Sequence, residues 1–352
     1  MPGAPHSPES LARQHALALS LSPGVGSVTY HELVARFGTA SQAFEGALRT
    51  TERDDALRRA REVLARAQSC GARLLLGADD DYPGALNDLD PPPAVLFTLG
   101  TLGTVRPPCV AIVGTRRATA YGERVTRELS ASLARAGACV VSGLARGVDA
   151  AAHRGALDAG GLTAAVLGTG IDIAFPAAHR ALHAQIGATG LLISEEMPGA
   201  HGTRASFPKR NRIIAALAEL TIIVEAGVGS GALITAAHAL DLERQVAAVP
   251  GPIDAPQSAG SNELLRDGAH VIASVADALA LLRLTPPFAR PTELAGPAER
   301  AIWTALSLGP CDADTLATRS ALPARDCLAA ITALELSGAI ECSLTGELRR
   351  RG

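Results

Sequence analysis

Short apolar runs that alternate with glycine-containing loops and helical stretches occupy the middle of the chain. The six runs are Val110–Val113, Cys139–Ser142, Ala164–Leu167, Leu191–Ser194, Thr221–Glu225 and Val246–Val249. Most of their residues are β-branched or leucine, and the runs are apolar on both faces, which is typical of parallel strands covered by helices on both sides. The sequence therefore predicts an α/β fold built on a doubly wound, extended Rossmann-like parallel sheet.

The flanking segments differ from this central part. They divide the chain into a disordered Pro- and Ser-rich tail (1–10), a small helical domain (11–71), the sheet domain (72–284), a linker (285–296) and a C-terminal domain (297–352). In the helical domain, the Pro-Gly-x-Gly turn at residues 23–26 is similar to half of a helix-hairpin-helix, which indicates a SAM-like or HhH-like module. The C-terminal domain shows three short helices and a two-strand ribbon, which predicts a winged helix.

Composition and charge narrow the class of protein. The chain has 352 residues, of which 47% are hydrophobic, enough for two or three domains without disulfides. Its net charge of −3 excludes a uniformly basic surface, so any nucleic-acid site must be a local patch. The six cysteines form no Cys-x-x-Cys pair, and the hydrophobic pattern predicts neither a signal peptide nor a membrane-spanning stretch. We expect a cytoplasmic protein with no membrane association.

Glycine-rich loops follow the predicted strands, and in an open parallel sheet they meet at one edge. Five such loops are Gly114–Arg117, Ser142–Asp149, Gly168–Gly170, Gly227–Gly231 and Pro250–Gly251. Their free amides and the following helix N-termini predict an anion site, most simply for phosphate. Neither a GxGxxG fingerprint after the first strand nor a P-loop is present, so NAD and ATP are disfavoured and no cofactor is expected.

A basic segment, Phe207-Pro208-Lys209-Arg210-Asn211-Arg212, opens a predicted helix. Three cations in the first helical turn oppose the helix dipole, and a bound polyanion would offset that cost. With Phe207 as an aromatic neighbour, the segment suits single-stranded nucleic acid. A solvated charged face is an equally open interpretation of these cations.

Other candidates carry weaker signals. His179 and His183 have the i, i+4 spacing of metal ligands but no third ligand nearby in sequence, so they are interpreted as ordinary helix residues and no metal is expected. Asp149 is interpreted as a helix N-cap. Ser142 and Ser230 have no evident His and Asp partners, so no catalytic residue is assigned.

The ordered motifs of the central domain resemble those of the DNA-processing protein A (DprA, or Smf) family, from about Asp79 to Leu282. The segments that carry the resemblance are Gly114-Thr115-Arg116, residues 142–149, 168–176, 194–195, 207–214, 230–236 and 250–251. The resemblance implies a dimeric protein that binds and protects single-stranded DNA during natural transformation, loads RecA onto it, and has no enzymatic turnover. It also implies DNA contacts at Arg116, Lys209, Arg210, Asn211 and Arg212, with Phe207 as a base-stacking neighbour. We further expect the loop amides at Gly114, Ser142, Gly143, Ser230 and Gly231 to bind phosphate oxygens, and Thr115, which keeps the hydroxyl of the family's usual serine, completes the predicted DNA site.

Two alternatives and one open question accompany this interpretation. The same sheet is similar to nucleotide phosphoribohydrolases of the lysine-decarboxylase-like type, but residues 225–235 lack the expected Glu after the glycines. A structural scaffold leaves the cations of residues 208–214 unexplained. The third helix of the predicted winged helix carries Arg325 but also Asp326 and Glu335, so binding of double-stranded DNA and binding of a protein partner remain equal alternatives there.

Overall fold

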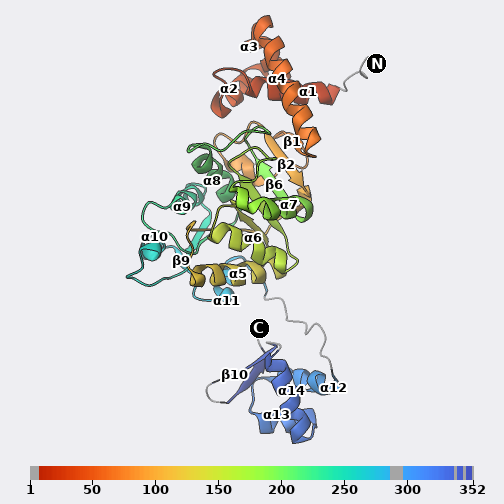
Figure 1. Ribbon diagram of the computed structural model, residues 1–352, viewed down its shortest axis with the longest axis vertical. Helices are drawn as coiled ribbons and strands as arrows, with labels where there is room; N and C mark the ends of the chain where they lie inside the picture. Colours follow the sequence, from red (N-terminus) through yellow and green to blue (C-terminus); the bar gives the residue numbers. More distant parts are fainter. Residues whose placement is uncertain (1–7, 286–295, 337–338, 344–345, 351–352) are drawn as a thin grey trace. The chain divides into compact units, whose positions relative to one another are not determined.

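The computed structural model describes residues 8–285, 296–336, 339–343 and 346–350, and the chain divides into two compact units between residues 285 and 286 (Figure 1). The first unit holds a helical domain and a large sheet, and the second is a small domain with its own core. Among the described helices, none is long and apolar enough to cross a lipid bilayer.

Four helices form the N-terminal domain: α1 (Pro8–Ser20), α2 (Ser27–Phe37), α3 (Ala40–Ala47) and α4 (Thr50–Ser69). Leu17, Phe44 and Ala60 are buried between them, and α2 is capped at its C-terminus by Gly38, whose φ of +99° favours glycine. The expected disordered tail is wrong for residues 8–10, because α1 already begins at Pro8. Residues 1–7 lie outside the described part.

A nine-stranded sheet forms the centre of the first unit. Its strands are β1 (Arg73–Leu75), β2 (Leu96–Gly100), β3 (Cys109–Val113), β4 (Cys139–Ser142), β5 (Thr163–Leu167), β6 (Leu191–Ser194), β7 (Leu220–Ile223), β8 (Gln245–Ala248) and β9 (His270–Val271). Their order is β1-β2-β6-β5-β4-β3-β7-β8-β9, and every pairing from β6 to β9 is parallel, whereas β1 and β2 are antiparallel additions. The predicted doubly wound parallel sheet is confirmed. Strands β1 and β9, with three and two residues, are too short to show in the sequence pattern.

Helices cover both faces of this sheet, as alternation along β3 shows. Val110 and Ile112 pack in a cluster with α5 (Ala120–Arg135), α6 (Val148–Asp158) and α11 (Val275–Leu281). Ala111 and Val113 point to the opposite face, towards α8 (Ser206–Leu217), α9 (Gly231–Asp241) and α10 (Ala259–Arg266). Helix α7 (Arg180–Thr189) packs with a further cluster near β6. A strand buried on both faces needs apolar side chains at every position, which explains the continuous apolar runs.

The second unit has three helices and a two-stranded antiparallel ribbon. Its elements are α12 (Pro297–Ala305), α13 (Ala313–Ser320), α14 (Ala324–Leu336), β10 (Ile340–Cys342) and β11 (Leu348–Arg350). Ile302, Leu316 and Cys327 form its core. This order confirms the predicted winged helix. In the ribbon, Arg349 pairs with Glu341 at 2.6 Å, and Arg350 lies over the ring of Trp303.

Candidate nucleic-acid interface

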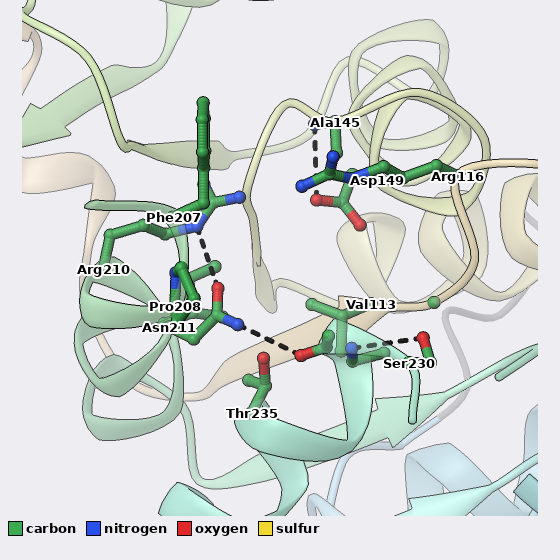
Figure 2. Close-up of a pocket in the computed structure, with 14 residues that line it drawn as sticks. Val113, Arg116, Ala145, Asp149, Phe207, Pro208, Arg210, Asn211, Ser230 and Thr235 are labelled. Atoms are coloured by element: carbon green, nitrogen blue, oxygen red, sulfur yellow. Dashed lines mark hydrogen bonds between the residues drawn. The ribbon is translucent and has the colours of Figure 1, made fainter. Parts of the chain in front are cut away.

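A pocket opens at the carboxyl ends of the central strands. The chain runs from β3 to β6 on one side and continues with β7 on the other side of β3, so the strand order reverses beside β3. Ligands of open α/β sheets bind at such a switch point. The pocket is lined by Val113, Gly114, Arg116, Ala145, Asp149, Phe207, Pro208, Arg210, Asn211, Ile214, Ser230, Gly231, Ala232 and Thr235 (Figure 2).

The loop after β3 carries Arg116 and is held by close backbone packing. A Cβ on Gly114 would lie 2.8 Å from the carbonyl oxygen of Glu225 and 2.6 Å from Cγ2 of Val148. The N–H of Thr115 donates to the same Glu225 oxygen at 2.6 Å, and its Oγ1 accepts from the N–H of Arg117 at 3.2 Å. Gly114 and Thr115 therefore hold the loop in place.

Arg116 is the cation of this loop that faces the pocket. Its side chain is exposed, and its guanidinium carbon lies 5.7 Å from the centre of the Phe207 ring. Within the described part of the chain it makes no ion pair. A guanidinium beside an aromatic ring, with no carboxylate at ion-pair distance, can take a phosphate in two parallel hydrogen bonds.

Arg210 has a different environment, because it points into the protein. Its side chain is only 7% exposed, and Nη1 donates to the carbonyl oxygens of Gly143, at 2.7 Å, and of Val166. Its Nε donates to Oδ1 of Asn211 at 3.0 Å. Burial lowers the pKa of Arg210 to about 10, and nearby Asp149 opposes that shift. Arg210 stays charged at neutral pH and braces the pocket wall.

The other two cations of α8 share one carboxylate. Arg212 is largely buried, donates to Glu195 Oε1 at 2.5 Å and donates to the carbonyl oxygen of Pro91 at 2.9 Å. Lys209 is half exposed, with Nζ 3.8 Å from Glu195 Oε2. Arg212 donates through both of its Nη atoms inside the protein, and Arg210 keeps only Nη2 without an acceptor among the described residues, so these two cations are less available to a DNA backbone than expected. Lys209 keeps donors available to a ligand.

The loop after β4 also departs from expectation. Ser142 is buried and its Oγ donates to the carbonyl oxygen of Ile112 at 2.7 Å, while the N–H of Gly143 donates to Oδ2 of Asp149 at 3.2 Å. Neither group is available to a phosphate. Asp149 is not a helix N-cap either, because Gly147 holds that position and Asp149 lies inside α6, with its carboxylate bonded back to the loop.

The N-terminus of α9 forms the opposite wall. Ser230 caps the helix by accepting from the N–H of Ala232 at 3.4 Å. Asn211 Nδ2 donates to the carbonyl oxygen of Gly231 at 3.1 Å, so both ends of its amide are used and it joins α8 to α9. The backbone N–H of Gly231 has no acceptor among the described residues and lies at the positive end of a helix. This wall can bind an anion through its backbone.

A second hollow beside the first contains residues that the sequence analysis missed. It is lined by Arg116, Arg117, Gly143, Ala145, Arg146, Phe175, Pro176, Ala177, Phe207 and Arg210. Phe175 is 48% exposed, and its ring centre lies 5.0 Å from that of Phe207. Arg117 and Arg146 are exposed at its rim. Aromatic residues make up only 3% of the chain, so an aromatic residue in a loop at the carboxyl edge of the sheet is a signal that could identify Phe175 as a site residue.

The two histidines are core residues. His179 and His183 are each 8% exposed, and each has a ring nitrogen 3.0 Å from a backbone carbonyl oxygen, of Leu144 and Ile171 respectively. No cluster of three His, Cys, Asp or Glu side chains that could hold a metal ion occurs among the described residues.

This fold and pocket define a Rossmann-like protein with a basic, aromatic ligand site in its sheet domain, and the sequence adds a helical domain before that domain and a winged helix after it. Family models match all three parts: the DprA-like N-terminal HHH domain over residues 11–68, DNA recombination-mediator protein A over 73–283, and the DprA winged helix domain over 286–343. The chain belongs to the DNA recombination-mediator protein A family, also called DprA or Smf.

Individual relatives agree with this assignment. A DNA processing protein DprA of Mycobacterium tuberculosis is 42% identical over 293 residues, covering 77% of this chain and 75% of the relative. The DNA processing protein DprA of Streptococcus pneumoniae is 41% identical over 206 residues, covering 57% and 71%.

Two solved structures are similar as well. The crystal structure of DNA processing protein A from Streptococcus pneumoniae matches with a TM-score of 0.68 and 31% identity, covering 76% of this chain and 97% of that one. A structure concerned with the single-stranded DNA binding mode of the Helicobacter pylori protein matches with a TM-score of 0.55 and 31% identity, covering 60% and 95%.

Proposed function

We propose that this chain is a single-stranded DNA-binding protein of natural transformation and recombination. The observation that carries the proposal is the grouping of Arg116 with Phe175 and Phe207 at the carboxyl edge of the sheet. Unpaired bases stack on exposed aromatic rings, and the adjacent guanidinium binds the phosphate between them. The Helicobacter pylori relative, whose structure concerns single-stranded DNA binding, supports the same class of ligand.

We infer that the pocket binds without turnover. Ser142 Oγ is held by a backbone carbonyl, and the buried carboxylate of Glu225 accepts from the N–H and hydroxyl of Thr119 at 2.9 and 2.5 Å. These bonds direct both groups away from a role as nucleophile or base. Neither Ser142 nor Glu225 lines the pocket, and residues 227–235 lack the glutamate that the phosphoribohydrolase alternative requires.

Membership of the family supports a proposal about the wider role. We propose that the protein acts in the cytoplasm as a homodimer, protects incoming single strands and loads RecA onto them. Faster assembly of RecA filaments on single strands coated with single-strand-binding protein is the expected result of adding this chain.

Binding of double-stranded DNA by the winged helix is a lesser proposal. The exposed face of α14 presents Arg325 together with Asp326, Leu328 and Glu335, so it offers little positive charge to a duplex. A protein partner suits this face better.

The test of the proposed function is fluorescence anisotropy with a labelled single strand and with the matched duplex, across a range of salt concentrations. We expect tighter binding of the single strand and a log–log salt slope that reflects a few phosphate contacts, about 0.7 for each. Equal binding of both forms, or no binding of the single strand, would refute the proposal.

Replacing Phe175 with alanine should weaken single-strand binding. Loss of one stacked base corresponds to about 1–3 kcal/mol, and the salt slope should not change because no charge is removed. Leu162→Ala, which removes an exposed apolar side chain at the amino end of β5, on the edge of the sheet opposite the pocket, is the matched control and should leave the affinity unchanged. An unchanged affinity of Phe175→Ala would show that this ring does not contact bases.

A further inference from the structure

Glu225 lies directly after β7 and contacts both ends of the loop that carries Arg116. Its carbonyl oxygen accepts from the N–H of Thr115 at 2.6 Å, at the start of this loop. Its carboxylate accepts from the N–H and the hydroxyl of Thr119 at 2.9 and 2.5 Å, at the end of the loop. Arg116 stands between these two anchor points and faces the pocket. One residue from the strand beside β3 therefore fixes the backbone on either side of this cation.

Two glycines leave the room that Glu225 needs. A Cβ on Gly114 would lie 2.8 Å from the carbonyl oxygen of Glu225, and a Cβ on Gly122 would lie 2.4 Å from Oε2 of its carboxylate. Gly122 belongs to the first turn of α5, and within a helix glycine is less favourable than alanine because it loses more backbone entropy on folding. The close approach of the carboxylate explains why glycine occupies this position.

The environment of the carboxylate makes its bonds to Thr119 hard to break. Glu225 is only 3% exposed, and within the described part of the chain it makes no ion pair. A buried charge without a cation depends on hydrogen bonds to its charged form. Thr119 donates two such bonds, and the N-terminus of α5 adds the positive end of a helix dipole. Releasing Thr119 would leave a buried carboxylate without these donors, so the end of the loop stays anchored.

We propose that Glu225 is a positioning residue for the phosphate contact of Arg116. This inference rests on the proposed function. The Arg116 side chain is exposed, so the backbone of the loop determines where its guanidinium lies. With that backbone already fixed, binding of a phosphate has to order the side chain alone, whereas a released loop would have to be ordered at the expense of affinity. Glu225 does not line the pocket and acts only through the loop.

The test measures single-strand affinity and its salt slope by fluorescence anisotropy for two variants of Glu225. Glu225→Ala removes both bonds to Thr119 and should weaken binding about tenfold, with a slope flatter by up to about 0.7, because the phosphate contact of Arg116 is impaired. Glu225→Gln keeps both bonds, since its amide oxygen accepts from the N–H of Thr119 and its NH₂ group donates to the hydroxyl. It should bind with the affinity and slope of the wild type.

A double variant separates positioning from a purely structural role. In the Arg116→Ala background, Glu225→Ala should cause no further loss of affinity, because the contact on which Glu225 acts is already absent. An unchanged salt slope in Glu225→Ala, or an additional loss in the double variant, would overturn the proposal. Failure of the wild type to bind the single strand would instead overturn the proposed function.

Asp277→Ala is the matched control. Asp277 accepts from the N–H and the hydroxyl of Ser274 at 2.7 and 3.0 Å at the N-terminus of α11, so the variant removes the same kind of bonds outside the pocket. It should keep the wild-type affinity and slope.

Gly122→Ala provides the test if circular dichroism shows that Glu225→Ala does not fold. The added Cβ displaces the carboxylate from Thr119 and keeps its charge. This variant should also weaken binding and flatten the slope, and wild-type binding by it would overturn the proposal.

Discussion

Replacing Arg116 with alanine should reduce the affinity for single-stranded DNA by about 10- to 100-fold, since a charge-assisted hydrogen bond contributes about 1.5–3 kcal/mol. Arg116 faces the pocket and has no carboxylate partner among the described residues, so its charge is available to a phosphate. The salt slope should flatten by about 0.7, the contribution of one single-strand contact. Anisotropy titrations across salt measure both quantities.

Arg135→Ala is the matched control for this variant. Arg135 is exposed at the C-terminal end of α5, from which the chain enters β4 at the opposite edge of the sheet. The control removes the same charge and should change neither affinity nor slope. If both variants weaken binding equally, the effect is that of net charge, and Arg116 is not a phosphate ligand.

Replacing Arg210 with methionine should lower the free energy of unfolding by about 3–5 kcal/mol, because a buried charge network loses one partner. The change leaves the carbonyls of Gly143 and Val166 without their donor and removes a positive charge that stabilises the buried carboxylate of Asp149. Denaturant titration followed by circular dichroism measures the loss, and DNA binding should fall with it.

The neighbouring cation offers a control for Arg210. Lys209→Met removes a half-exposed charge from the same helix and should change the free energy of unfolding by no more than about 0.5 kcal/mol. Equal destabilisation by the two variants would contradict the assignment of Arg210 as the internal brace of the pocket.

The sequence predicts the fold well because its signals are local. A strand buried on both faces must be apolar throughout, so β3 to β8 appear as runs in the sequence. The sequence also predicts where the pocket lies, because the carboxyl ends of parallel strands meet at one edge of the sheet. The sequence does not predict which cations of residues 207–212 are buried and which are exposed. Only tertiary packing brings the carbonyls of Gly143 and Val166 to Arg210.

The same limit applies to the glycines and to Phe175. Gly143 meets Arg210, where a Cβ would lie 2.2 Å from Nη2, so this glycine makes room for a side chain and not for a ligand. Phe175 and Phe207 are 32 residues apart and meet only because two loops converge. The sequence therefore does not show that the two rings are in contact, although each residue lies in a recognisable motif.

The most direct test of the central claim is photochemical cross-linking of a single strand containing 5-iodouracil, followed by peptide mapping. This base cross-links to aromatic rings on which it stacks, and the chain has only six Phe, three Tyr and one Trp, so the assignment is sharp. We expect cross-links at Phe207 and Phe175, lost in competition with unlabelled single strand. Cross-links confined to Trp303 of the winged helix or to Tyr30 of the N-terminal domain would contradict binding in this pocket.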